Sequence, residues 1–145
     1  MEIYTIGFAG RKAADFFGKL KQHGIKRLID VRLNNTSQLS GFSKKDDLRF
    51  FLKEICQADY IHEPLLAPTD KLLDDYKKKK CHWANYEAIF NKLMADRQVD
   101  NKIDRILFKV PTVLLCSETK ADQCHRRLIA EYLREKWGDV KIIHL

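Results

Sequence analysis

The sequence lacks the long apolar run of a membrane protein and the paired cysteines of a secreted disulfide scaffold. No apolar stretch approaches the ~20 residues that span a bilayer, and the residues after Met1 show no signal-peptide pattern. The four cysteines include no Cys-X-X-Cys pair. We therefore expect a cytoplasmic protein with no membrane partner, in which the cysteines are reduced thiols.

Internal repeats, low-complexity segments and linker-like stretches are also absent, so residues 1–145 are expected to form one domain. Apolar residues make up 45% of the chain, which is enough for a core and excludes a disordered protein. The formal net charge of +7 favours anionic partners, although it is equally typical of a solubilising surface.

Short apolar runs alternate with segments of helical periodicity. The predicted strands are residues 3–6, 27–31, 59–62, 112–116 and 140–143. Continuous apolar strands separated by helices are typical of a sheet that is buried on both sides. The sequence therefore predicts an α/β fold: a single-domain, mostly parallel sheet of about five strands with helices on both faces, in a Rossmann-like three-layer arrangement.

The helices are predicted from apolar spacing and from their end signals. The first ends at Gly24, and Ser43 and Asp122 are the predicted N-caps of two later helices. Residues 65–104 are expected to be mostly helical, with the number of helices left open. The inner face of this region is predicted to carry Trp83, Tyr86, Phe90 and Leu93.

Unusual polar residues follow three of the predicted strands. Because the carboxyl ends of parallel strands meet at one edge of a sheet, where ligands bind, we expect these residues to converge there. They are Gly7, Gly10 and Arg11 after the first strand, Asp30 and Arg32 at the second, and Cys116 and Glu118 at the fourth, with Cys124, His125 and Arg126 opening the next helix.

The first two groups each admit two interpretations. Gly7, Gly10 and Arg11 can bring backbone N–H groups and a helix N-terminus towards an anion, or they can form only a tight strand-to-helix connection. Asp30 and Arg32 alternate on a strand and point to the same face. They form either a structural ion pair or a clamp for a phosphate or carboxylate.

The segment after the fourth strand carries the most specific pattern. A helix N-terminus and nearby cations are expected to lower the pKa of Cys124, so a thiolate nucleophile with His125 as partner is one prediction. Glu118 is a candidate general base. The alternatives are that Cys116 is a small buried residue, that His125 is a buried core histidine, and that Arg126 only pairs with Glu118.

Cys116, Cys124 and His125 are also ligand types that suit zinc. Adjacent residues on a helix are hard to direct at one ion, and the sequence offers no evident fourth ligand. No metal site is therefore predicted, and the cofactor is left open. A disulfide between Cys116 and Cys124 is geometrically conceivable but disfavoured in a reducing compartment.

Taken together, these residues resemble the domain of unknown function 488 family. The resemblance keeps the motif order over nearly the whole chain, and it implies a compact α/β domain of bacteria or archaea without an established activity. Phe8 stands where many members carry a histidine, and Leu66-Ala67-Pro68 stands where many carry Leu-Gly-Gly. The motifs are Tyr4–Gly7 with Gly10-Arg11, Ile29–Arg32, Gly41–Lys44, Cys116–Glu118 and Cys124–Arg126.

The first functional hypothesis is that the protein binds or acts on an anionic small molecule, such as a nucleotide or a phosphorylated compound. Arginines 11, 32 and 126 would hold the anion, and Glu118 would supply acid–base chemistry with Cys124 or His125 assisting. The alternative is a nucleic-acid-binding or regulatory domain without catalysis, supported by the basic run Lys77–Lys80. A sulfur-handling role of the cysteines is a third hypothesis. The reaction, if any, and the oligomeric state stay open.

Overall fold

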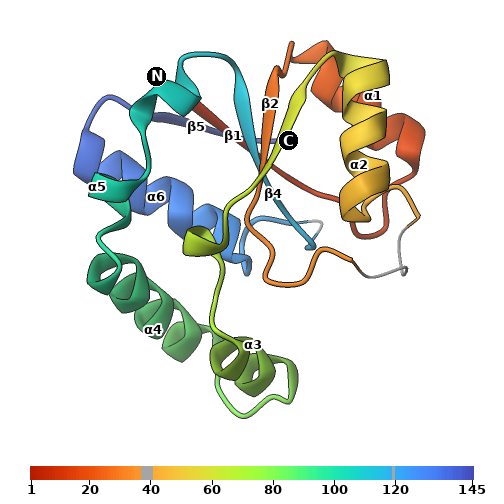
Figure 1. The fold of residues 1–145 in the computed structure, drawn as a ribbon. Coiled ribbons are helices and arrows are strands. Elements are labelled where there is room, and N and C mark those ends of the chain that lie inside the picture. The colour runs from red at the N-terminus through yellow and green to blue at the C-terminus, as the bar shows by residue number, and fades with distance from the viewer. Residues whose placement is uncertain (37–40, 119) are drawn as a thin grey trace.

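The computed structural model describes residues 1–36, 41–118 and 120–145, which form an α/β arrangement around one five-stranded sheet (Figure 1). All the strand pairs are parallel, so the fold prediction is confirmed and the sheet is parallel throughout. The sheet order is β3-β2-β4-β1-β5. The strands are β1 (Glu2–Gly7), β2 (Arg27–Asp30), β3 (Asp59–His62), β4 (Thr112–Cys116) and β5 (Lys141–His144).

The carboxyl ends of β1, β2 and β4 lie at one level of the sheet. The register sets Gly7 opposite Cys116 and Asp30 opposite Leu115. β4 lies between the other two, and all of its residues are buried, as expected for a continuous apolar strand. Residues that follow these three strands are therefore close together, although more than 80 positions separate the end of β4 from the ends of β1 and β2 along the chain.

Helices cover both faces of the sheet (Figure 1). On one face, α1 (Ala13–Gln22) and α2 (Lys45–Phe51), which continues as a π-helical turn at Leu52–Cys56, pack on a core that includes Phe16, Phe17 and Leu28. On the other face, α4 (Trp83–Asp96), α5 (Val99–Lys102) and α6 (His125–Trp137) share a core with β4. The helices after β1 and β4 thus leave neighbouring strands towards opposite faces, which is the arrangement that opens a crevice at the sheet edge.

The region between β3 and β4 contains the helices whose number the sequence left open. Here α3 (Asp70–Lys77) lies beside the first turns of α4 (Figure 1), and short 3-10 turns occur at Pro64–Leu66 and Arg105–Phe108. Tyr86 and Phe90 are buried as predicted, while Trp83 and Leu93 are half-buried. Among helices in the described ranges, none has the length and apolar character required to span a bilayer.

Two predicted helix caps are wrong. α2 begins after Lys44 and α6 begins after Cys124, and neither N-cap side chain makes a capping hydrogen bond. The carbonyl of Ser43 instead accepts a hydrogen bond from Arg32, and the carbonyl of Asp122 accepts one from Arg127. Before α6, the Cys124 N–H donates to the Ala121 carbonyl in a turn, and the helix therefore begins later than the sequence predicted.

Candidate functional site

A pocket of about 660 Å³ opens at the carboxyl ends of β2 and β4. Five of the ten predicted site residues line it: Arg32, Cys116, Glu118, Cys124 and His125. The rest of the described lining comes from the segment after β2, from the α3–α4 region and from the approach to α6, and consists of Leu33, Asn34, Pro68, Leu73, Tyr76, Lys77, Lys79, Cys81, His82, Trp83, Tyr86, Ser117 and Gln123.

The turn that follows β4 is packed tightly against β1. A Cβ added at Gly7 would lie 1.5 Å from the Glu118 carbonyl oxygen, so only glycine fits there. The Ala9 N–H donates to the Ser117 carbonyl at 2.9 Å. From the other side, the buried Arg126 guanidinium donates to the Glu118 carbonyl. Gly7 and Arg126 therefore affect the pocket indirectly, because they fix the backbone of the turn that carries Glu118.

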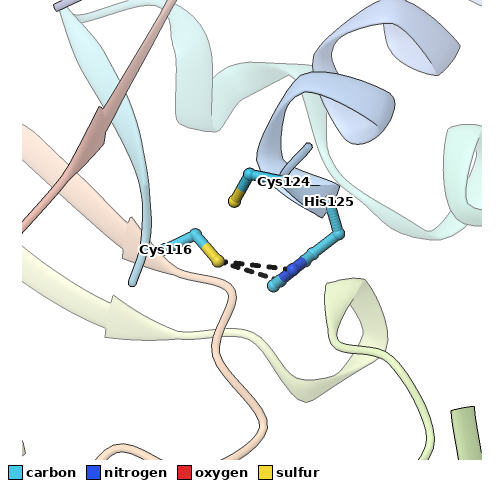
Figure 2. Close-up of side chains that lie close together, drawn as sticks. All are labelled: Cys116, Cys124 and His125. Atoms are coloured by element: carbon cyan, nitrogen blue, oxygen red, sulfur yellow. Dashed lines mark hydrogen bonds between the residues drawn. The ribbon is translucent and has the colours of Figure 1, made fainter. Parts of the chain in front are cut away.

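Cys116 and His125 face one another at the buried end of the pocket (Figure 2). The Cys116 Sγ lies 3.3 Å from His125 Nδ1 and 3.8 Å from Nε2. The Nε2 atom is 2.8 Å from the carbonyl oxygen of Val31. Since a carbonyl can only accept, Nε2 carries a proton, and in the neutral tautomer that this bond selects the Nδ1 lone pair is directed to the sulfur.

Cys124 completes this cluster. Its Sγ, the Cys116 Sγ and a ring nitrogen of His125 all lie within 4.8 Å of one another, and Figure 2 shows the side chains directed to a common space. The three residues come from the end of β4 and the start of α6. The structure therefore brings together the groups that sequence reasoning considered hard to direct at one point.

The two thiols differ in their pKa values. Burial raises the pKa of Cys116, but the hydrogen bond with Cys124, the charge of Arg126 and the backbone N–H groups of the next two residues leave it below its ordinary value. Burial, followed by the interactions with Cys116, raises the pKa of Cys124. The expected lowering of the Cys124 pKa is therefore wrong, because burial and Cys116 outweigh the lowering by His125.

A family model described as "Domain of unknown function DUF488" matches residues 12–133. The chain belongs to the DUF488 family. The match includes Asp30, Arg32 and the whole segment from Cys116 to Arg126, so the resemblance inferred from the sequence motifs is confirmed. Comparison with curated proteins and with solved structures gives no match.

In this DUF488 protein, Asp30 and Arg32 form a buried ion pair. Arg32 Nε and Nη2 donate to the two Asp30 carboxylate oxygens at 2.9 and 2.8 Å, and the exposed fractions of the side chains are 6% for Arg32 and 0% for Asp30. Asp30 also accepts a hydrogen bond from the Tyr60 hydroxyl at 2.6 Å. Arg32 lies over the ring of Phe8, 5.1 Å from its centre. The ion-pair interpretation thus holds, with Arg32 reaching the pocket and Asp30 supporting it.

Gly10 and Arg11 of this DUF488 protein do not belong to the described lining of the pocket. Arg11 donates hydrogen bonds to the Asp15 carboxylate at 3.0 Å and to the Leu145 carbonyl at 2.9 Å. Gly10 has a φ of +71°, which favours glycine. This part of the chain therefore matches the interpretation of a tight strand-to-helix connection.

The aromatic wall of the pocket was missed by the sequence reasoning, which placed Trp83 and Tyr86 on the inner face of a helix. Tyr76 at the end of α3 and Trp83 and Tyr86 at the start of α4 pack on one another, with ring centres 5.0–5.7 Å apart. Lys77 and Lys79 lie next to this wall, at the mouth of the pocket. One signal for this wall was present in the sequence, where Tyr76 and Trp83 lie close together with the lysine run Lys77–Lys80 between them.

Proposed function

We propose that this DUF488 protein binds an anionic small molecule that carries a planar ring, with nucleotides as the first class to test. The single observation that carries the proposal is the lining of one pocket by an aromatic wall and by two exposed lysines. A volume of about 660 Å³ falls within the usual range for small-molecule sites. Rings contact the wall in this proposal, and the anionic group contacts the lysines.

The charges of the lining support an anionic ligand. Lys77 and Lys79 are exposed at the mouth, whereas Arg32 is already neutralised by Asp30. Glu118 is the carboxylate of the described lining. The positive field at the mouth therefore comes from the two lysines, and it attracts anions more strongly at low ionic strength.

The buried end of the pocket supplies groups for chemistry on the bound molecule. Cys116, Cys124 and His125 lie there, and Glu118 is exposed on the lining. In this proposal Glu118 is the exposed proton acceptor, and the end of the ligand that enters the pocket most deeply lies next to the cluster of Cys116, Cys124 and His125.

Charge reversal at the two lysines is expected to weaken nucleotide binding. The Lys77→Glu/Lys79→Glu variant should bind ADP at least tenfold more weakly than wild type, because two attractive charges become repulsive ones and each exposed charge contact contributes up to about 1 kcal/mol. Isothermal titration calorimetry at low salt measures this change. Lys19→Glu/Lys21→Glu in the last turn of α1, outside the described lining of the pocket, makes the same change in net charge and should bind ADP as wild type does.

The proposal fails if neither AMP, ADP nor inorganic phosphate binds the wild type, or if the control variant loses as much affinity as the pocket variant. Binding of single-stranded oligonucleotides without binding of mononucleotides would instead favour the nucleic-acid alternative, with the lysines as phosphate contacts.

Removal of the rim carboxylate should have the opposite effect on affinity. Glu118→Gln is expected to bind ADP about two- to fivefold more tightly, because an exposed like charge beside an anion costs about 0.3–1 kcal/mol. The gain should shrink as salt is added. Calorimetric titrations at two salt concentrations test this, and unchanged or weaker binding at both would place the ligand's anionic group away from Glu118.

A further inference from the structure

The cluster at the buried end of the pocket has the composition of a zinc site. We propose that Cys116, Cys124 and His125 bind one Zn²⁺ ion, with a fourth coordination position open to the pocket. Two thiolates and an imidazole are ligands that favour zinc over magnesium or calcium. This inference goes beyond the proposed function and does not depend on it, since metal binding is measured without any anionic ligand.

The spacing of the donor atoms suits a tetrahedral ion. Zinc bonds of about 2.3 Å to sulfur and about 2.0 Å to nitrogen set neighbouring donor atoms roughly 3.4–3.8 Å apart. The Cys116 Sγ and His125 Nδ1 are 3.3 Å apart, and all three donor atoms lie within 4.8 Å of one another. The donor atoms therefore have to approach one another by no more than about 1 Å to complete the geometry.

The start of α6 explains how two adjacent residues reach one ion. Successive side chains on a helix point about 100° apart, which is why Cys124 and His125 looked incompatible as co-ligands. Cys124, however, precedes the first helical residue and has extended dihedrals of φ −140° and ψ 138°. Its side chain therefore does not follow the helical rotation, and it points to the same space as those of His125 and Cys116 (Figure 2).

The hydrogen bond between His125 and Val31 prepares the ring for a metal. The Val31 carbonyl accepts from Nε2 at 2.8 Å, which leaves Nδ1, the nitrogen nearer to Cys116, as the coordinating atom. Metal-binding histidines usually donate their other N–H to a carbonyl or carboxylate in this way. The ring of Phe90 packs against His125, with centres 5.5 Å apart, and helps to hold the orientation.

Charge balance also favours the ion. The three ligands are buried, and two thiolates with Zn²⁺ and a neutral imidazole form a group with no net charge, which avoids the cost of burying two anions. Zinc binding releases the thiol protons to solvent. Three protein ligands with an open position are typical of catalytic zinc, and here all three ligands line the pocket, so that position faces the space where a ligand would bind.

The proposal is tested by titrating the reduced protein with Zn²⁺ and with Co²⁺. Wild type should bind one equivalent of either metal, and the cobalt form should show tetrahedral d–d absorption together with sulfur-to-metal charge transfer. Cys124→Ser and His125→Ala should each lose at least 100-fold in zinc affinity, measured by competition with a chromophoric chelator. Cys81→Ser changes a cysteine that lines the pocket outside the cluster, and it should bind as wild type does.

X-ray absorption at the zinc edge keeps the test independent of whether the variants fold. In the wild type, two sulfur ligands and one imidazole nitrogen are expected, with a light atom as the fourth. A wild-type protein that binds no zinc, a first shell of nitrogen and oxygen only, or variants Cys124→Ser and His125→Ala that keep full affinity would each overturn the zinc site. None of these outcomes affects the ADP titrations, so the two proposals fail separately.

Discussion

The Gly7→Ala variant is expected to lose at least about 3 kcal/mol of its free energy of unfolding, the top of the usual range for overpacking. The added Cβ would lie 1.5 Å from the Glu118 carbonyl oxygen and 2.9 Å from Arg126 Nη1. A side chain such as that of Arg126 can move, but Glu118 presents backbone here. The turn after β4 must therefore shift, and Cys116 at its base shifts with it.

Urea denaturation measures this loss, and Gly18→Ala is the matched control. Gly18 lies inside α1, and a Cβ there meets nothing within 4 Å. That substitution should raise stability by about 0.5–1 kcal/mol, because alanine favours the helix more than glycine does. If both variants had the same stability, the close approach of β1 and the turn would not constrain the fold.

Replacement of Asp30 by alanine should cost about 3–5 kcal/mol, because it leaves the Arg32 charge buried without its carboxylate. The Arg32 side chain is 6% exposed, so water replaces the lost oxygens poorly. The Tyr60 hydroxyl loses an acceptor in the same variant. Thermal or urea unfolding gives the change, and Asp15→Ala, which removes the exposed partner of Arg11, should cost no more than about 1 kcal/mol.

A double variant distinguishes the contribution of the ion pair to stability from the contribution of side-chain packing. Asp30→Leu/Arg32→Met removes both charges, and it should be more stable than Asp30→Ala alone because no unpaired charge stays buried. If instead the double variant lost the sum of the two single losses, the contribution of Asp30 would lie in packing and in its bond to Tyr60. A loss of stability in Asp15→Ala as large as that in Asp30→Ala would also contradict a role specific to the buried ion pair.

The strands and the edge where the site lies were predictable because short, mostly apolar runs occur five times along the chain, and unusual polar residues follow three of them. β3 and β4 match the predicted residues, and the other strands differ by one or two positions. The sequence pattern therefore contains the information for the fold class. It contains less information about where helices start. Ser43 and Asp122 have side chains of the cap-forming type, but neither caps a helix, and their backbone carbonyls accept hydrogen bonds from Arg32 and Arg127.

The chemistry of the cysteines depended partly on remote segments. Hydrogen bonds and charges from residues 116–126 shift the pKa values of Cys116 and Cys124, but burial raises both values, and this burial comes from a core shared with β1, α4 and α6. The aromatic wall is a second feature that the sequence alone did not predict. The spacing of Trp83 and Tyr86 predicts an inner helix face, but only the packing of α3 on α4 turns part of that face to the pocket.

Local patterns of apolar and polar residues were thus sufficient for the parallel sheet, its strand ends and the family, because each depends on the order of residues along the chain. The strand order, the extended backbone at Cys124 and the meeting of its sulfur with Cys116 and His125 required the folded molecule. These features depend on which distant segments pack together, and the energies that select such packing are spread over many contacts that no single stretch of sequence contains.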